Sequence, residues 1–150
     1  MKCPLNSALE FINYIRSPYI KDLDDLERLA AKFGWKTSYE IKKRARQNDT
    51  TVIITDLNQN IEWVSNCFEK LTDYERKDAI GKTPRILQGP LTDRKTLDKI
   101  KETILKNLPF KGELINYKKN GQLYLCNIEI YPLVNKQNHV VNYVAFEREG

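Results

Sequence analysis

The last forty residues constrain the fold most, because three strand-like runs there are joined by very short turns. The runs cover residues 110–118, 122–133 and 139–148, and the turns are NG at 120–121 and NKQN at 135–138. Connections this short join strands that are antiparallel neighbours. Apolar residues alternate on both sides of the runs, so both faces of the resulting sheet should be buried.

Residues 51–109, before these runs, add two more strands and several helices. TVIITD at 51–56 and IEWVS at 61–65 flank the polar turn LNQN and predict a hairpin with a four-residue loop. Asn66 with Glu69, and Thr72 with Glu75, match capping pairs that begin two short helices. The order of elements predicts an α+β fold with one five-stranded antiparallel sheet and short helices on one face.

A longer helix should connect the hairpin to the three last strands. It is expected from Asp93 to Leu108 and should be ended by Pro109. Its apolar residues recur at steps of three and four, which places them on one face against the sheet. These residues are Leu97, Ile100, Ile104 and Leu108.

The first fifty residues read as helices without a strand pattern. One apolar stripe runs through DLDDLERLAAKF, and Gly34 should end that helix in a left-handed conformation. We therefore predict an N-terminal helical extension at 1–50 and an α+β domain at 51–150. The extension, a second subunit or both should cover the outer face of the sheet, so a homodimer through that face and these helices is expected. The acidic residues Asp22, Asp24 and Asp25 are expected to be solvated charges near a helix start.

Composition excludes several classes of protein. Cys3, Cys67 and Cys126 are far apart and odd in number, so neither a disulfide framework nor a CxxC metal site is indicated. His139 is the single histidine and lies in a polar turn, which leaves no partner for a catalytic pair. We therefore expect no catalytic residues, no metal and no enzyme activity.

Location and nucleic-acid binding follow from charge and hydropathy. No apolar run approaches the ~20 residues of a membrane span, and the N-terminus lacks a secretory pattern, so a cytoplasmic protein without membrane contact is expected. The net charge is +5, with one basic cluster in IKKRARQ at 41–47. Ala30 and Gly34 have a helix-turn-helix spacing, but Glu40 stands where an aliphatic residue belongs. DNA binding through these helices stays an alternative that we do not expect.

The stretch GKTPRILQGPLTD at 81–93 combines a helix start with a glycine-rich turn. Thr83 followed by Pro84 suits the first turn of a helix, because the hydroxyl can cap and proline loses no hydrogen bond there. Together with ELINYKKNG and the closing NYVAFE, this order of elements resembles the PAS sensory family. It is most similar to the light-oxygen-voltage branch, whose members bind flavin mononucleotide and carry GxNCRFLQGxxTD. The resemblance covers about residues 50–148.

The resemblance implies a flavin pocket that this chain keeps in part. Arg85 would hold the cofactor phosphate, Gln88 and Asn116 would contact the flavin through their amides, and Lys101 stands where a second arginine is usual. Leu97 retains an apolar wall. The cofactor-binding positions implied by the resemblance are Arg85, Gln88, Leu97, Lys101, Asn116, Cys126, Ile128, Ile130, Tyr143 and Glu147.

Four positions depart from the family pattern. Thr83 replaces an asparagine, Pro84 replaces the reactive cysteine, Cys126 replaces a second asparagine, and Glu147 replaces the glutamine near the reactive ring nitrogen. Proline has no thiol, so no cysteinyl-flavin adduct can form at Pro84. The changed polar pairings lower the affinity expected for flavin. We expect no bound cofactor, with an empty pocket or an apolar ligand, and keep flavin mononucleotide as the alternative.

Two main hypotheses of function remain. The first is a PAS-type signal-transduction module that works through ligand binding, dimerisation or a separate signalling protein. The second is a flavin-dependent redox or photoreduction sensor in which Trp63, Tyr124 or Tyr143 supplies an electron without an adduct. The second requires the cofactor, so the colour of the purified protein distinguishes the two.

Overall fold

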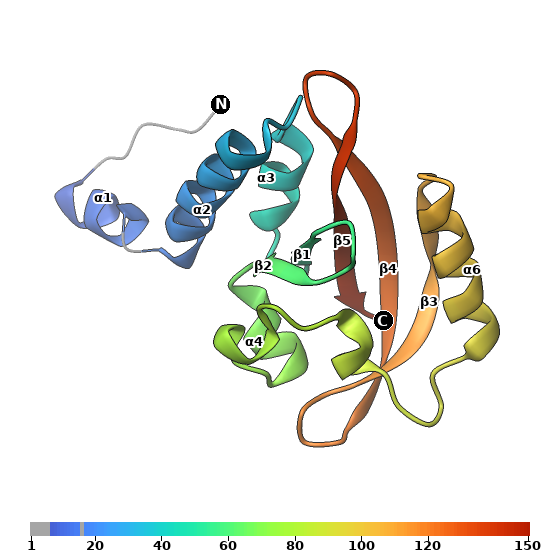
Figure 1. Ribbon diagram of the computed structural model, residues 1–150. Coiled ribbons are helices and arrows are strands. Elements are labelled where there is room, and N and C mark those ends of the chain that lie inside the picture. Colours follow the sequence, from blue (N-terminus) through green and yellow to red (C-terminus); the bar gives the residue numbers. More distant parts are fainter. Residues whose placement is uncertain (1–6, 16) are drawn as a thin grey trace.

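The computed structural model describes residues 7–15 and 17–150 and contains one five-stranded antiparallel sheet. Its strands lie in the order β2-β1-β5-β4-β3 between the N-terminal helices and helix α6 (Figure 1). This confirms the predicted α+β class. The strand bounds are β1 Thr51–Thr55, β2 Ile61–Val64, β3 Phe110–Tyr117, β4 Leu123–Val134 and β5 Val140–Glu149.

The strand register places residues on the two faces as the alternating pattern predicted. In the pairing of β4 with β5, Ile128 lies opposite Glu147 and Ile130 opposite Ala145. The β1–β2 loop covers 56–60, one residue more than expected, because Asp56 has left the strand. Its carboxylate accepts the backbone N–H groups of residues 58 and 60, which closes the loop.

Four helical segments lie between β2 and β3. They are α4 Cys67–Thr72, α5 Arg76–Ala79, the 3-10 helix η1 Pro84–Leu87 and α6 Arg94–Leu105. Helix α6 packs Leu97, Ile100 and Ile104 toward the sheet. The prediction that it reaches Leu108 is wrong: Asn107 adopts a left-handed φ of 54°, and Leu108 is 53% exposed. The helix therefore ends before the proline, whose ring disfavours helical backbone in the preceding residue.

The two predicted capping pairs do not form. The side chain of Asn66 makes no cap and donates to Asp22, while the Glu69 carboxylate accepts from the backbone N–H of Arg76. Thr72 is the last residue of α4 rather than the start of α5, and its hydroxyl donates to the carbonyl four residues earlier. At Asn66 the local pattern failed because Asp22, 44 residues away in sequence, took the side-chain amide.

The N-terminal helices cover part of the outer face. Helices α2 Pro18–Phe33 and α3 Tyr39–Ala45 are joined through Gly34, whose φ is 66° as the sequence predicted. They pack on the outer face of β1, β2 and β5, whereas α1 Ala8–Ile15 projects away from the sheet (Figure 1). The buried residues of this outer layer are Leu26, Trp35, Ile41, Ala45, Val52, Ile54, Trp63, Val144 and Phe146.

Asp22 corrects one expectation about this layer. It is fully buried rather than solvated, since it lies in the second turn of α2 and faces α4 and α5.

Within the described part of the chain, no helix is both long and apolar enough to cross a membrane.

Candidate functional site

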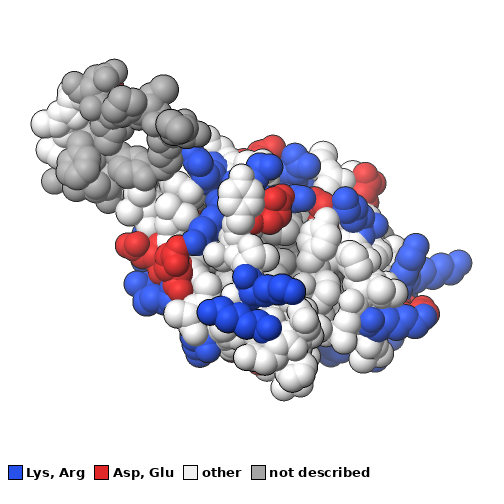
Figure 2. All heavy atoms as spheres, turned by 90° about the horizontal axis from the view of Figure 1, so that it is seen from above, with Lys and Arg blue, Asp and Glu red and all other residues white. Residues whose placement is uncertain are grey.

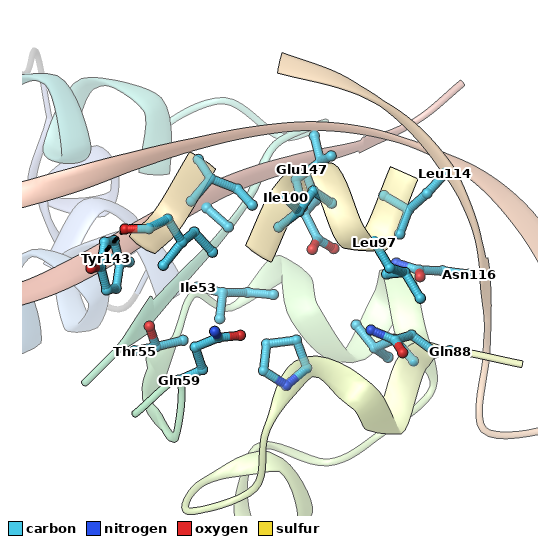
Figure 3. A pocket seen from close by; sticks show the side chains of 16 residues that line it. Ile53, Thr55, Gln59, Gln88, Leu97, Ile100, Leu114, Asn116, Tyr143 and Glu147 are labelled. Carbon is cyan, nitrogen blue, oxygen red and sulfur yellow. Dashed lines mark hydrogen bonds between the residues drawn. The ribbon is translucent and has the colours of Figure 1, made fainter. Parts of the chain in front are cut away.

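A cavity of about 90 Å³ lies between the inner face of the sheet, η1 and α6, and is called here the inner cavity. Its walls are mostly aliphatic, with six polar side chains placed around them (Figure 3). The aliphatic lining is Ile53, Pro84, Leu87, Leu97, Ile100, Ile104, Leu114, Ile128, Ile130 and Ala145. The polar lining is Thr55, Gln59, Gln88, Asn116, Tyr143 and Glu147.

A second hollow of about 430 Å³, the outer cleft, adjoins the inner cavity. The two share Pro84, Gln88 and Leu97 among their lining residues. The charged residues of the outer cleft are Arg85, Arg94, Asp98 and Lys101. With three cations and one carboxylate, the outer cleft suits an anionic group, whereas the inner cavity suits an uncharged or cationic one.

The start of the 81–93 stretch explains how the wall beside Pro84 is built. Gly81 has a φ of 82° and donates its N–H to the carbonyl of Ile61, which ties the stretch to β2. Pro84 takes the first position of η1, as predicted. The Thr83 hydroxyl does not cap this helix, and its backbone carbonyl accepts from Ile86 instead. The helix start therefore depends on proline and the backbone.

The second half of the stretch is held by close packing and side-chain hydrogen bonds. A Cβ added at Gly89 would lie 2.4 Å from the ring of Tyr117, so only glycine allows this approach. The Thr92 hydroxyl donates to the carbonyl of Ile115, and Asp93 caps α6 by accepting from the backbone N–H of Thr96 at 2.8 Å. These residues fix the shape of the loop. The 81–93 motif therefore has a structural role even though Pro84 stands in place of the reactive cysteine.

Glu147 is the one acidic residue lining the inner cavity, and it is 2% exposed. Its carboxyl group points into the cavity (Figure 3), and its Oε2 atom has no hydrogen-bond partner. Burial raises the pKa of Glu147 to about 7, and the hydrogen bond from the Cys126 thiol opposes that rise. Burial also raises the pKa of Cys126, so that thiol stays protonated and unreactive.

The other polar residues of the inner cavity lie toward two ends (Figure 3). Thr55, Gln59 and Tyr143 lie toward one end, while Gln88 and Asn116 lie toward the other. The Tyr143 hydroxyl is engaged, at 2.9 Å from Oδ1 of the side chain at position 107. Thr55 Oγ1 is buried without a partner. Buried polar atoms without partners are uncommon in folded proteins, and two of them line this one cavity.

The structure brings most of the predicted site residues together. Gln88, Leu97, Asn116, Ile128, Ile130, Tyr143 and Glu147 line the inner cavity, and Arg85 and Lys101 line the outer cleft. Cys126 lines neither, because it is fully buried behind Glu147. Sequence reasoning missed Thr55, Gln59 and Ile100 as lining residues. Ile100 was signalled by the helix period, whereas Gln59 reaches the cavity through a loop whose left-handed φ of 66° no motif marked.

The family model for the PAS domain matches residues 48–149, which contain the sheet, η1, α6 and both hollows. The chain belongs to the PAS domain family. The match begins just after the end of α3, so helices α1, α2 and α3 all lie outside it. No group of three potential metal ligands occurs in the part of this PAS protein that the structure describes.

Relatives of this PAS domain include regulators and photoreceptors. The nitrogen fixation regulatory protein of Klebsiella oxytoca is 31% identical over 103 residues, which cover 69% of this chain and 21% of that protein. The blue-light photoreceptor of Listeria innocua is 33% identical over 112 residues, which cover 73% of this chain and 44% of that protein. The PAS domain thus spans between a fifth and a half of these relatives.

Solved structures of light-oxygen-voltage domains share the fold. One, from work on a flavin analogue and the light-oxygen-voltage mechanism, matches with a TM-score of 0.69 and 27% identity, covering 75% of this chain and 85% of its own. The dark structure of the aureochrome1 light-oxygen-voltage domain matches with a TM-score of 0.68 and 28% identity, covering 77% and 86%. The chain is therefore a sensory PAS domain with light-oxygen-voltage neighbours.

The inner cavity can be tested against the flavin that the resemblance implies. Its polar edge fits a flavin ring in chemistry, and the cations of the outer cleft fit a phosphate. The volume does not fit: about 90 Å³ is smaller than the ~150 Å³ of an engineered cavity that holds benzene. Leu97 and Ile100 line both the inner cavity and the outer cleft, so they lie where the two hollows adjoin. As arranged, the residues present do not accommodate the flavin ring.

Proposed function

We propose that this chain is a non-catalytic PAS sensory module that works without bound flavin, and so without cysteinyl-flavin chemistry, through another small ligand, dimerisation or a separate partner protein. The observation that carries this proposal is the wall at Pro84, which borders both the inner cavity and the outer cleft. No sulfur atom of the described residues lines either hollow. Of the cysteines in the described residues, Cys126 is buried outside the lining, and Cys67 borders a different cleft with Lys70 and Lys118.

An absorption spectrum tests this proposal directly. The purified protein is measured from about 300 to about 550 nm, before and after incubation with flavin mononucleotide and desalting. The expected result is no flavin band in either sample, with any ligand found by other means. A structured band near ~450 nm that survives desalting would contradict the proposal and favour a flavin sensor.

A flavin-binding photoreduction sensor is the second candidate, favoured by the placement of the polar groups. Gln88 and Asn116 lie at the cavity end nearest Leu97 (Figure 3), while Arg85 lies in the adjoining outer cleft. Of the proposed electron donors Trp63, Tyr124 and Tyr143, only Tyr143 lines the cavity in which a flavin ring would lie. Illumination of the flavin-loaded protein with an external reductant should then give the reduced spectrum, and Tyr143→Phe should slow its formation.

Trp63 does not fit the role of electron donor that the sequence suggested. It packs in the outer layer, and its indole N–H donates to Asp25 at 2.9 Å. The sheet therefore separates its ring from the inner cavity. Tyr124 is buried on the inner face near Glu147, but it does not line the cavity.

Dimerisation through the outer face of the sheet is the specific interaction that we propose for this module. A groove of about 330 Å³ lies there between α3 and the sheet, with Tyr131, Leu133 and Phe146 in its lining. Leu125 on β4 is 36% exposed, so apolar surface of β4 stays uncovered by α2 and α3. A second copy of the chain would bury this surface, as expected for the homodimer.

Light scattering coupled to size-exclusion chromatography tests the dimer. Leu125→Glu should shift the protein to monomer by placing a charge in the interface. The matched control is Leu108→Glu, which is also exposed but follows α6, the helix on the inner face. A wild-type protein that stays monomeric at high concentration would remove this interface and leave ligand binding.

DNA binding through the N-terminal helices is the third candidate and the least supported. Lys42 pairs with Glu27, and Arg44 pairs with Glu40 and Glu129, so two cations of the basic cluster are already engaged. Figure 2 shows basic side chains spread over one face with acidic ones between them. Retention on heparin that does not change with salt would remove this candidate, because phosphate binding falls steeply with ionic strength.

A further inference from the structure

The carboxyl group of Glu147 faces no cation from any element packed against it. On β4 the Cys126 thiol donates to it and Tyr124 lies near it, and on β3 Asn116 lines the same cavity. The residues of η1 and α6 that line the inner cavity are uncharged, with Gln88 as the polar one. Among the described residues, Lys and Arg side chains line the outer cleft but not the inner cavity.

We propose that the inner cavity binds a small planar cation, of the size of a five-membered amino-heterocycle, whose N–H groups donate to Glu147. This inference deepens the proposed function and rests on it, because it names the ligand class of the PAS module. The ligand would lie between the aliphatic walls and complete the hydrogen bonding of Glu147 Oε2, which has no partner in the protein.

Three properties of the cavity select this class. The volume of about 90 Å³ limits the ligand to the scale of one small ring rather than a fused ring system, and an exocyclic group can extend toward the outer cleft past the shared lining residues Gln88 and Leu97. The apolar walls favour a flat ring with most of its surface carbon. Above the pKa of Glu147 a cation is favoured over a neutral ring, because the folded protein then holds a buried carboxylate and pairing with a cation adds attraction at low dielectric.

The second polar group needed to orient such a ring is also present. The amide oxygens of Asn116 and Gln88 can each accept a further N–H, and Figure 3 shows both side chains at one end of the cavity. Asn116 is 3% exposed, so its amide is held within the protein interior. A heterocycle with an exocyclic amino group presents donors in two directions and can reach Glu147 and one amide together.

Calorimetric titration of the full chain with two probes of the same shape tests the proposal. The probes are 2-aminoimidazole, which is cationic at neutral pH, and 2-aminothiazole, which is neutral there. At pH ~7.5 the cation should bind at least about tenfold more tightly. Its affinity should fall about tenfold per pH unit below the pKa of Glu147, because a proton must then be displaced. The affinity of the neutral probe should stay constant over the same range.

Glu147→Gln keeps the size of the side chain and should remove both the preference for the cation and its pH dependence. Equal affinities of the wild type for the two probes would overturn the inference, as would a preference that survives Glu147→Gln. If Glu147→Gln folds poorly, the pH dependence of cation binding to the wild type still tests the inference. Titration with flavin mononucleotide distinguishes failure of this inference from failure of the proposed function. Binding of flavin would overturn both. If neither probe nor flavin binds, only this inference is overturned.

Discussion

Two buried carboxyl groups on opposite faces of the sheet have the same burial and opposite surroundings. Asp22, on the outer side, is fully buried and accepts the backbone N–H of Asn66 at 2.9 Å, its side-chain amide at 2.6 Å and Arg76 at 3.1 Å. Glu147, on the inner side, is 2% exposed, and its Oε2 has no partner. The paired group joins α2 to α4 and α5, and the unpaired group is the one for which we propose a ligand.

The largest expected effect comes from breaking the paired site. Asp22→Ala removes three acceptor contacts: the two N–H groups of Asn66 lose their acceptor, and Arg76 loses one of its two carboxylate partners. Removing one partner from a buried charged cluster is expected to cost about 4 kcal/mol in the free energy of unfolding. Urea denaturation followed by circular dichroism measures the loss. The result would show that α2 is part of the folded unit, although the PAS family match begins after it.

Asp24→Ala is the matched control, because Asp24 is on the same helix and exposed. Its effect should stay within about 0.5 kcal/mol of the wild type. If both variants unfolded at the same urea concentration, the comparison between the two faces would fail, since Asp22 would then be no more important than a surface charge.

The unpaired site should show itself through pH. The pKa of Glu147 is raised by burial from 4.5 to about 7. Between these values the unfolded chain has lost the proton and the folded chain keeps it, so stability falls as pH rises through this window. The loss should reach about 3 kcal/mol above pH 7. Glu147→Gln cannot ionise, so it should gain stability relative to the wild type as pH rises.

Urea midpoints of the wild type and Glu147→Gln, measured from about pH 4 to about pH 8, give this difference. Glu149→Gln serves as the control, since Glu149 is exposed on the same strand and should give a profile parallel to the wild type. Parallel profiles for Glu147→Gln as well would mean that the buried carboxyl finds a partner, and the contrast with Asp22 would disappear.

The two carboxyl groups also show what sequence reasoning could reach. The strand pattern and the PAS resemblance placed Glu147 in the pocket, because its position follows from strand alternation. Asp22 was expected to be solvated, and its burial depends on Arg76, 54 residues away in sequence. Helix patterns carry no information on such a partner. The same reason applies to the failed cap at Asn66, whose side chain is taken by Asp22.

The size of the cavity could not be predicted from the sequence either, because it also depends on tertiary packing. The residue types at Leu97 and Gln88 indicate which groups face the pocket. The volume of the pocket depends instead on how closely α6 and η1 approach the sheet. The flavin alternative could therefore be weighed from residue types alone, whereas the mismatch in volume required the packed structure.

The smallest predicted effect has the opposite pH dependence and comes from the outer face. Glu129 on β4 lies 2.5 Å from Arg44 of α3 and also accepts from Tyr131 at 2.7 Å. The hydrogen bond from Arg44 is the main cause that lowers the pKa of Glu129 from 4.5 to about 2. The pair joins an N-terminal helix to the sheet, and its side chains are 22% and 21% exposed.

A lowered pKa reverses the sign found for Glu147. The stabilisation from Glu129 is present above pH 4.5 and is lost as pH falls toward 2, because the folded state must then accept a proton it binds weakly. Partial exposure limits the contribution to about 1 kcal/mol. Glu129→Gln should therefore lower the urea midpoint at pH 7 and converge with the wild type near pH 2, while the exposed Glu113→Gln on β3 follows the wild type throughout. A deficit for Glu129→Gln that is independent of pH would mean that packing, rather than the ion pair, joins α3 to the sheet.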